Sequence, residues 1–273
     1  MKKILFLLAA LFVFTSINAA NKYDNPDTIV VARDGTGEFR TIDEAIEVCR
    51  AFMEYQKVIY VKKGVYKEKL IVPSWLTNIT IKNITLENNA AKLGQAVCLH
   101  TEGDNLTFEN CRILGNQDTI YTGTPGTHCY FHNCYIEGTT DFIFGPSAAW
   151  FENCEIHSKA NSYVTAASTP KDQAYGYVFN HCKLTAAEGV DKVYLGRPWR
   201  PYAHTLFMNC EMDSHICPLG WHNWGNKDNE KTTRYEEYNN TGAGASTKQR
   251  ASWSHQLTKK EASQITMAKV LGK

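Results

Sequence analysis

Two aspartates stand at the same offset from two copies of a repeated phrase, and this shared phase makes them the strongest candidates for chemistry. The phrases FENCRI, from Phe108, and FHNCYI, from Phe131, each carry a cysteine at the fourth position, and Asp118 and Asp141 follow those cysteines by seven residues. If the copies stack as neighbouring strands, the carboxylates lie roughly 4.8 Å apart along the stack. Two carboxylates that close raise one pKa and leave the other low, which gives an acid and a base or nucleophile at one pH.

Carboxamides accompany the aspartates one residue earlier in the same phase. Gln95, Gln117 and Thr140 align at that position, and a carboxamide is suited to hold an oxyanion as it develops. The competing interpretation is an amide ladder that only ties neighbouring rungs together. Each aspartate alone could equally be a turn cap, the commoner role of an aspartate in a loop. The shared phase beside two glutamines favours the catalytic interpretation.

Arg197, in the segment LGRPW, is the best candidate for a cation beside the site. A guanidinium next to Asp141 would keep that carboxylate ionised and oriented, whereas an isolated arginine is more often a solvated surface charge. Five aromatic residues could stack on sugar rings or could pack in the core instead. They are Tyr121, Phe144, Trp199, Trp221 and Trp224.

The elements that must position these residues come from the repeat itself. Six phrases recur: LENNAA, FENCRI, FHNCYI, FENCEI, FNHCKL and FMNCEM, starting at Leu86, Phe108, Phe131, Phe151, Phe179 and Phe207. A period of twenty-odd residues is typical of a solenoid. The residue before the fourth position is Asn in five copies, and Asn tolerates left-handed backbone and can hydrogen-bond along a stack. The sequence predicts an all-β, single-domain, right-handed parallel β-helix rather than a sandwich or barrel.

Short elements are expected at both ends of the solenoid. A capping box from Thr41 to Glu44 opens a helix predicted to continue to Met53 and to cover the N-terminal end of the solenoid. A second capping box, opening at Thr258, predicts a final helix through Val270, packed on the outside of the solenoid. Apolar runs predict strands over 29–32, 58–61 and 69–72.

Residues 1–20 are expected to be a cleaved signal peptide. Lys2 and Lys3 precede an apolar run over 4–14, too short to span a bilayer, and small residues end at Ala20. Residues 21–273 are therefore expected to form one exported domain, periplasmic or secreted, with no membrane partner.

The composition argues against several classes of function. The chain has 29 Lys and Arg against 28 Asp and Glu, without a broad basic field, so no nucleic acid partner is expected. No HExxH, Cys-x-x-Cys or Gly-rich phosphate motif occurs, so no metal or cofactor is expected. Five of the nine cysteines occupy the fourth position of the repeat, which predicts a buried ladder of thiols rather than a disulfide framework.

At these motifs the chain resembles the pectin methylesterases, the pectinesterase family of carbohydrate esterases, in their bacterial type. The motifs are GVYKE from Gly64, QAV from Gln95, QDTIY from Gln117, DFIFG from Asp141, LGRPW from Leu195, GWHNW from Gly220 and LTK from Leu257. The resemblance covers nearly the whole chain after residue 20 and implies a right-handed β-helix.

The resemblance also implies a reaction and a role for each site residue. Asp141 resembles the nucleophile, Asp118 the acid that then becomes the base, and Gln117 the oxyanion stabiliser. Gln95, Arg197 and Trp199 resemble substrate-binding positions. The implied activity removes methyl esters from methylated galacturonan, giving pectate and methanol, with pectin as the partner of a monomer and no cofactor or metal.

One departure from the family pattern stands between Asn78 and Ile79. The family carries a further stretch there, of about two rungs, which includes a substrate-contacting threonine, and in this chain the flanking segments are fused. Two alternatives therefore stay open. One is a β-helix glycoside hydrolase acting on polygalacturonate with paired carboxylates, and the other is a non-catalytic pectin-binding relic.

Overall fold

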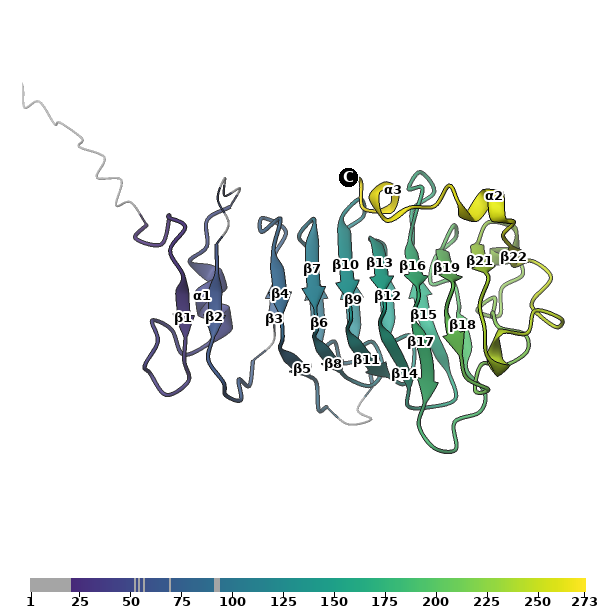
Figure 1. The fold of residues 1–273 in the computed structure, drawn as a ribbon, viewed down its shortest axis with the longest axis horizontal. Helices are drawn as coiled ribbons and strands as arrows, with labels where there is room; N and C mark the ends of the chain where they lie inside the picture. Colours follow the sequence, from purple (N-terminus) through teal and green to yellow (C-terminus); the bar gives the residue numbers. More distant parts are fainter. Residues whose placement is uncertain (1–20, 52, 54, 56, 69, 91–93) are drawn as a thin grey trace, which may run out of the picture.

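The fold is a stack of short parallel strands that winds through three sheets (Figure 1). A computed structural model describes residues 21–51, 53, 55, 57–68, 70–90 and 94–273. The expected signal peptide lies outside these residues. Every strand pair within the described part of the chain is parallel, and successive strands enter the three sheets in turn, so one rung is one pass through all three. The predicted parallel β-helix is confirmed.

Sheet 1 carries the candidate site, and sheets 2 and 3 close each rung. Sheet 1 contains β3 (Leu70–Val72), β6 (Leu99–Thr101), β9 (Ile120–Thr122), β12 (Ile143–Gly145), β15 (Tyr163–Ala167) and β18 (Tyr194–Gly196). Sheet 2 contains β4 (Thr80–Lys82), β7 (Leu106–Glu109), β10 (His128–His132), β13 (Ala148–Glu152), β16 (Tyr177–Asn180), β19 (His204–Met208), β21 (Arg234–Tyr238) and β22 (His255–Gln256). Sheet 3 contains β5 (Thr85–Glu87), β8 (Arg112–Leu114), β11 (Tyr135–Gly138), β14 (Glu155–Ser158), β17 (Lys183–Ala186) and β20 (Glu211–Met212).

A column of phenylalanines forms the centre of the core. Phe131, Phe151 and Phe179 are fully buried and in register, and their ring centroids are 4.6 and 4.3 Å apart, nearly parallel. Burying each such side chain contributes about 1.5–3 kcal/mol, and the aromatic contact adds about 0.5–1.5 kcal/mol. The column therefore ties each rung to its neighbours.

The cysteine ladder lies beside this column. All nine cysteines are unpaired and buried, as the sequence predicted for the five in the repeat. The thiol of Cys134 donates to the carbonyl oxygen of Phe108 at 3.4 Å, and that of Cys182 to Phe151 at 3.4 Å, so a thiol of one rung reaches the backbone of the rung before it. A small side chain with a weak donor suits this interior position.

The asparagines before the cysteines turn the chain between sheets 2 and 3. Asn110, Asn133 and Asn153 all have φ between 53° and 54°, in the left-handed region. The Nδ2 of Asn133 donates to Oδ1 of Asn110 at 2.7 Å, and the Nδ2 of Asn239 donates to Oδ1 of Asn209 at 2.9 Å. Both the left-handed turn and the hydrogen bonds between stacked asparagines are confirmed.

The first copy of the repeat begins five residues earlier than the sequence motif suggested. Strand β4 pairs Ile81 with Phe108, and Asn83 has φ of 58°. Ile84 therefore takes the place of the cysteine. The predicted copy that starts at Leu86, with Asn89 at its fourth position, is wrong. This rung uses isoleucine at both the Phe and the Cys positions, so matching the motif by residue type selected a later pair of asparagines instead.

The N-terminal unit, residues 21–68, lies at the start of the solenoid (Figure 1), and its Ala45 and Ile46 share one buried cluster with Leu70 of β3. Its strands β1 (Ile29–Val31) and β2 (Ile59–Val61) form a two-stranded sheet of their own, and Val31 also makes a bridge to Phe39. The capping box at Thr41 is present, but helix α1 (Ile42–Glu47) ends well before Met53, where Cys49 N–H bonds back to Ile46 in a tighter turn. Phe52, within the predicted extension, lies outside the described residues.

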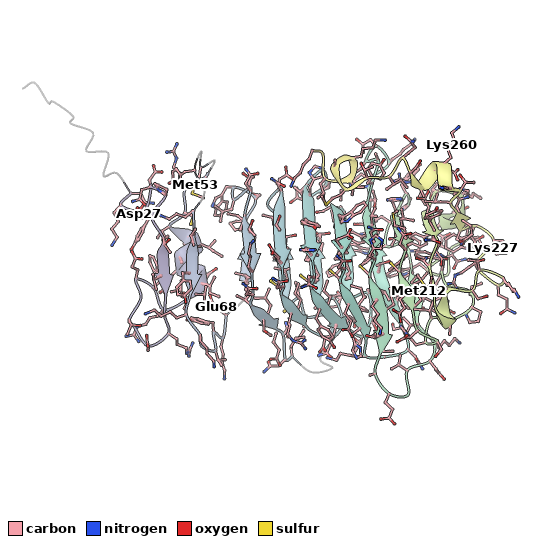
Figure 2. The ribbon with its side chains drawn as sticks, in the orientation of Figure 1. Asp27, Met53, Glu68, Met212, Lys227 and Lys260 are labelled. Atoms are coloured by element: carbon pink, nitrogen blue, oxygen red, sulfur yellow. The ribbon has the colours of Figure 1, made fainter. Side chains whose placement is uncertain are left out.

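Glu68, labelled in Figure 2, ends the N-terminal unit and binds the start of its helix. Its carboxylate accepts the N–H groups of Ile42 at 3.0 Å and Asp43 at 2.8 Å, at the start of helix α1. The amides of a first helical turn lack partners within the helix, so a carboxylate there is stabilising.

The C-terminal segment runs back along the outside of sheet 2 (Figure 1). It contains two short helices, α2 (Lys259–Ala262) and α3 (Met267–Val270), rather than the single predicted helix. The predicted capping box at Thr258 is present, but Thr266 caps a new helix by accepting from Lys269 N–H, which divides the segment. Val270 and Leu271 pack on a cluster that includes Trp150, so the outside placement is confirmed. In the described part of the chain no helix is long and apolar enough to cross a membrane.

Candidate active site

The two aspartates lie on adjacent rungs at the entrance to sheet 1. Asp118 precedes β9 and Asp141 precedes β12. The N–H of Asp118 donates to the carbonyl oxygen of Thr140 at 3.0 Å, the same pattern that pairs Ile120 with Ile143 in the strands that follow. The structure therefore places Asp118 and Asp141 opposite each other, as the counting predicted.

Both aspartates adopt a left-handed backbone, with φ of 64° at Asp118 and 48° at Asp141. Aspartate enters this region more readily than most residues. Their exposed fractions are only 6% and 5%. Because the same left-handed turn occurs in successive rungs, both side chains leave the backbone in the same direction. The pairing of the two aspartates therefore follows from the stacking of the rungs.

Arg197 binds Asp141 through two hydrogen bonds. Its Nε donates to Oδ1 at 2.9 Å and its Nη2 to Oδ2 at 2.6 Å. The guanidinium lies between two rings, 4.0 Å from the centroid of Tyr163 and 3.7 Å from that of Trp224. A bidentate pair held between aromatic faces fixes both the charge and the orientation of the Asp141 carboxylate. The predicted contact between Arg197 and Asp141 is confirmed.

Burial dominates the electrostatics of the pair. Desolvation and the nearby charge of Asp141 raise the pKa of Asp118 to about 6, against a smaller opposing effect of Arg197. Desolvation also raises the pKa of Asp141, and the bonds from Arg197 oppose that rise. The expectation that one of the two pKa values stays low is therefore wrong, because both side chains lose water. Arg197 still distinguishes them, since only Asp141 is bonded to it.

The two glutamines lie side by side along the backbone next to the aspartates. Ala96 N–H donates to the carbonyl oxygen of Gln117 at 3.2 Å, which sets Gln95 opposite Gln117. The N–H groups of Cys98 and Leu99 both point to Thr119 O, at 2.8 and 3.1 Å. Two residues of one rung thus lie opposite one residue of the next, which is a β-bulge. The bulge explains why Gln95 and Gln117 are 22 residues apart, whereas the paired strand residues Leu99 and Ile120 are 21 apart. Gln117 is half-buried and Gln95 is exposed.

A row of rings runs across sheet 1 beside the aspartates. The centroids of His100 and Tyr121 are 4.9 Å apart, those of Tyr121 and Phe144 are 4.8 Å apart, and those of Phe144 and Trp199 are 5.8 Å apart. Motif analysis missed His100, although its register with Tyr121 follows from the alternation of β6.

The two tryptophans of the GWHNW segment have separate roles. Trp221 is fully buried and stacks on Tyr235 at 4.3 Å, so it packs in the core and is not a sugar platform. Trp224 is 38% exposed and lies over Arg197. The contacts of Tyr163 and Trp224 with Arg197 were not predicted from the sequence, because three segments distant in sequence meet there.

No group of three or more His, Cys, Asp or Glu residues in the described part of the chain is arranged to hold a metal ion. What the geometry offers is a buried carboxyl that holds its proton near pH 6, a carboxylate oriented by a guanidinium, and two glutamines opposite each other on neighbouring rungs. This set fits acyl transfer through a carboxylate nucleophile.

Comparison with known proteins points to one family. The Pectinesterase family model matches residues 28–82 and 76–273. Pectinesterase 31 of Arabidopsis thaliana is 33% identical over 281 residues, covering 85% of this chain and 88% of that protein. Pectinesterase/pectinesterase inhibitor 18 from the same plant is 33% identical over 89% of this chain, which spans 53% of that longer protein.

The solved structures that are similar to this chain include pectin methylesterases. The pectin methylesterase from carrot superposes with a TM-score of 0.79 at 29% identity, covering 88% of this chain and 90% of that one. The pectin methylesterase from Erwinia chrysanthemi superposes with a TM-score of 0.72 at 26% identity, covering 91% and 98%.

The fold and the comparisons together define an esterase built on a parallel β-helix. Within that class, the chain belongs to the pectinesterase family.

Proposed function

We propose that this chain removes methyl esters from methylated galacturonan, with Asp141 as nucleophile and Asp118 as acid and then base. The observation that carries this proposal is the unequal pair on adjacent rungs. Asp141 is held by two bonds from Arg197, while burial and the charge of Asp141 raise the pKa of Asp118 to about 6. One carboxyl is thus prepared to attack and the other to carry a proton.

In the first half of the reaction the ionised Asp141 attacks the carbonyl carbon of the methyl ester. The carbonyl oxygen becomes an oxyanion, and the carboxamides of Gln95 and Gln117 donate hydrogen bonds to it. When the intermediate collapses, the bond from carbon to the methoxy oxygen breaks, and Asp118 transfers its proton to the departing methanol. The product is an anhydride between Asp141 and the galacturonate.

In the second half Asp118, now ionised, takes a proton from water as the water attacks the galacturonyl carbon of the anhydride. The bond from that carbon to the Asp141 oxygen breaks, which releases the galacturonic acid group and returns Asp141 to its ionised form, and the acid then loses its proton to solvent. Asp118 ends protonated, as it began, so the cycle balances without a cofactor.

The partner in this proposal is pectin, bound across sheet 1 by a monomeric, exported enzyme. Two similar structures are pectin methylesterases in complex with hexasaccharides, at 26% identity and TM-scores of 0.74 and 0.72. The rings of Tyr121, Phe144 and Trp199 form a surface on which sugars could stack. Gln95, Arg197 and Trp199 are proposed to contact the substrate.

The fused segment at Asn78 is proposed to weaken substrate binding rather than catalysis. The family model matches the chain in two segments that meet within residues 76–82, which supports an interruption of the family pattern there. Gln95 still lies opposite Gln117, and Asp118 opposite Asp141. Because contacts in a solenoid are made between neighbouring rungs, the loss falls on subsites nearer the N-terminal unit.

Methanol release from methylated pectin tests the proposal directly. The intact chain should release methanol without creating new reducing ends. New reducing ends without methanol would favour the glycoside hydrolase alternative, and binding of pectin with neither product would show a non-catalytic relic.

A further inference from the structure

The GWHNW loop, residues 220–224, connects the end of the solenoid to Arg197. Trp221 anchors it from below, since its Nε1 donates to Oε1 of the buried Glu237 at 3.1 Å. The N–H of His222 donates to the carbonyl oxygen of Gly196 at 3.1 Å, next to Arg197 in sequence. These two hydrogen bonds fix the start of the loop, and Trp224 lies at its other end.

A histidine ring nitrogen holds Trp224 in place. The Nδ1 of His222 accepts the backbone N–H of Trp224 at 3.0 Å. Trp224 has φ of 61°, a left-handed backbone that a bulky residue rarely adopts. In this conformation its ring lies 3.7 Å from the guanidinium of Arg197. The hydrogen bond to His222 thus supports a strained residue that touches the arginine of the site.

This hydrogen bond exists only with a neutral imidazole. A backbone N–H can only donate, so Nδ1 must keep its lone pair, and a protonated imidazole has donors at both nitrogens. Protonation of His222 would replace the acceptor by a second donor and add a positive charge beside Arg197.

The groups around His222 come from two strands and the segment that follows the second. The rings of Tyr163 on β15 and Tyr194 on β18 lie 5.3 and 5.4 Å from its centroid. Arg197 follows β18, and its charge is bound to Asp141. Desolvation, followed by the charge of Arg197, lowers the pKa of His222 below its ordinary value. The neutral form is therefore retained below the usual range, and the contacts that need it are lost as the pH falls through the lowered pKa.

We propose that neutral His222 is a positioning residue for the esterase reaction, which holds Trp224 over Arg197 and thereby keeps Arg197 aligned with Asp141. The inference rests on the proposed function and extends it, because it gives the site an acid-sensitive support outside the two carboxyls. Neither His222 nor Trp224 contacts the reacting atoms in this mechanism.

A pair of substitutions separates acceptor from charge. Asparagine at position 222 would offer an uncharged acceptor at the same place, since Asn223 Oδ1 already accepts the N–H two residues on, from Gly225, at 2.8 Å. Alanine at position 222 removes the acceptor. His222→Asn and His222→Ala are therefore matched variants that differ in this one hydrogen bond.

The ratio of kcat/KM between variant and wild type, measured against pH, is the decisive quantity, because the acid limb of Asp141 cancels in it. Above about pH 7.5, a unit above the ordinary histidine pKa, His222→Asn should equal the wild type and His222→Ala should be roughly tenfold slower. As the pH falls, His222→Asn should come to exceed the wild type by roughly tenfold, while His222→Ala approaches it. Ratios that do not change with pH, or an asparagine variant that behaves as the alanine variant, would overturn the inference.

A fluorescence titration gives a readout that does not depend on activity. The pH-dependent signal of Trp224, isolated by subtracting the Trp224→Phe variant, should show an acid transition in the wild type that His222→Asn lacks. If no variant releases methanol, the proposed function fails, and this titration still decides whether His222 holds Trp224. A missing transition in the wild type, or one that persists unchanged in His222→Asn, would refute the role of His222.

Discussion

The N-terminal unit and the rungs that carry the aspartates are built from the same short strands but differ in how many neighbours each strand has. In and beside the rungs of the aspartates, β9, β12 and β15 each pair with a strand on both sides. In the N-terminal unit β2 pairs with β1 alone among the described residues, and Val58, Tyr60 and Val65 leave 46%, 58% and 71% of their surface exposed.

A solenoid tolerates change best at its ends. A rung held on both faces fixes the backbone turn that aims Asp118 and Asp141, because the left-handed residue in one rung bonds to the next. A unit at the end of the stack has only one such face. A change at the end of the stack, such as the fused segment proposed at Asn78, should therefore leave the geometry of the site intact.

The largest expected effect is loss of the nucleophile. Asp141→Asn should reduce methanol release by more than about 10³-fold, and Asp118→Asn by about 10² to 10⁴-fold, since each removes a group that changes bonds or carries a proton. The matched control is Asp34→Asn in the N-terminal unit, where the carboxylate only accepts from Thr36, and it should be indistinguishable from wild type. Near-normal turnover in Asp141→Asn, with folding confirmed by circular dichroism, would contradict the proposed roles.

Removing a phenylalanine should destabilise the protein more in the solenoid than in the N-terminal unit. Phe151→Ala removes a ring stacked on both sides and should lower the free energy of unfolding by about 3–5 kcal/mol. Phe39→Ala makes the same change in the N-terminal unit, where Phe39 is half-buried against Tyr23 at 5.2 Å. It should cost roughly 1–2 kcal/mol and leave methanol release unchanged. Urea denaturation measures both, and equal losses would show that the two regions unfold as one equally packed body.

Replacing the acid should stabilise the protein at neutral pH. The pKa of Asp118 is raised to about 6, so the folded chain binds that proton more tightly than the unfolded chain. This contribution to stability is complete below the ordinary carboxyl pKa and is lost as the pH rises through 6. Asp118→Asn should therefore raise stability by roughly 1–3 kcal/mol at pH 7–8. Calorimetry at pH 4 should show that gain disappearing, and a gain that is constant with pH would mean the carboxyl is not desolvated.

The smallest expected effect concerns the fused segment. Inserting between Asn78 and Ile79 the stretch that a close relative carries there should lower KM roughly tenfold while kcat stays within about twofold, because it restores uniform binding only. Steady-state methanol release measures both constants, and the same insertion in Asp141→Asn should remain inactive. An insertion that raises kcat by orders of magnitude at unchanged KM would show that the junction distorts the catalytic rungs themselves.

The sequence predicted most of what depends on repetition. Counting from Cys111 and Cys134 aligned Asp118 with Asp141. This succeeds because a parallel stack converts equal offsets along the chain into equal positions in space. Gln95 does lie opposite Gln117, but not by equal offsets, since it was counted from the copy at Leu86. Counting failed at Leu86, since the first rung uses isoleucine at the positions that the motif marks with Phe and Cys.

Contacts between unrelated segments could not be counted. The rings of Tyr163 and Trp224 on Arg197 come from separate rungs and a loop, and no periodicity relates them. The pKa of Asp141 was misjudged for a similar reason, because its burial depends on packing that sequence offsets do not contain. The ends of the helices were also missed, since Thr266 starts a new helix in a segment whose apolar spacing looks continuous.

The nine buried cysteines allow the local opening of the solenoid to be measured at several positions along its length. Burial raises the pKa of the thiols at Cys98, Cys129, Cys154 and Cys182, so each is unreactive while its rung is closed. An alkylating reagent modifies a thiol only after local opening, and mass spectrometry of the modified peptides then gives a separate rate for each cysteine. Cys49 in the N-terminal unit should react first and Cys154 near the middle among the last, so that nine natural residues record the direction in which the stack comes apart.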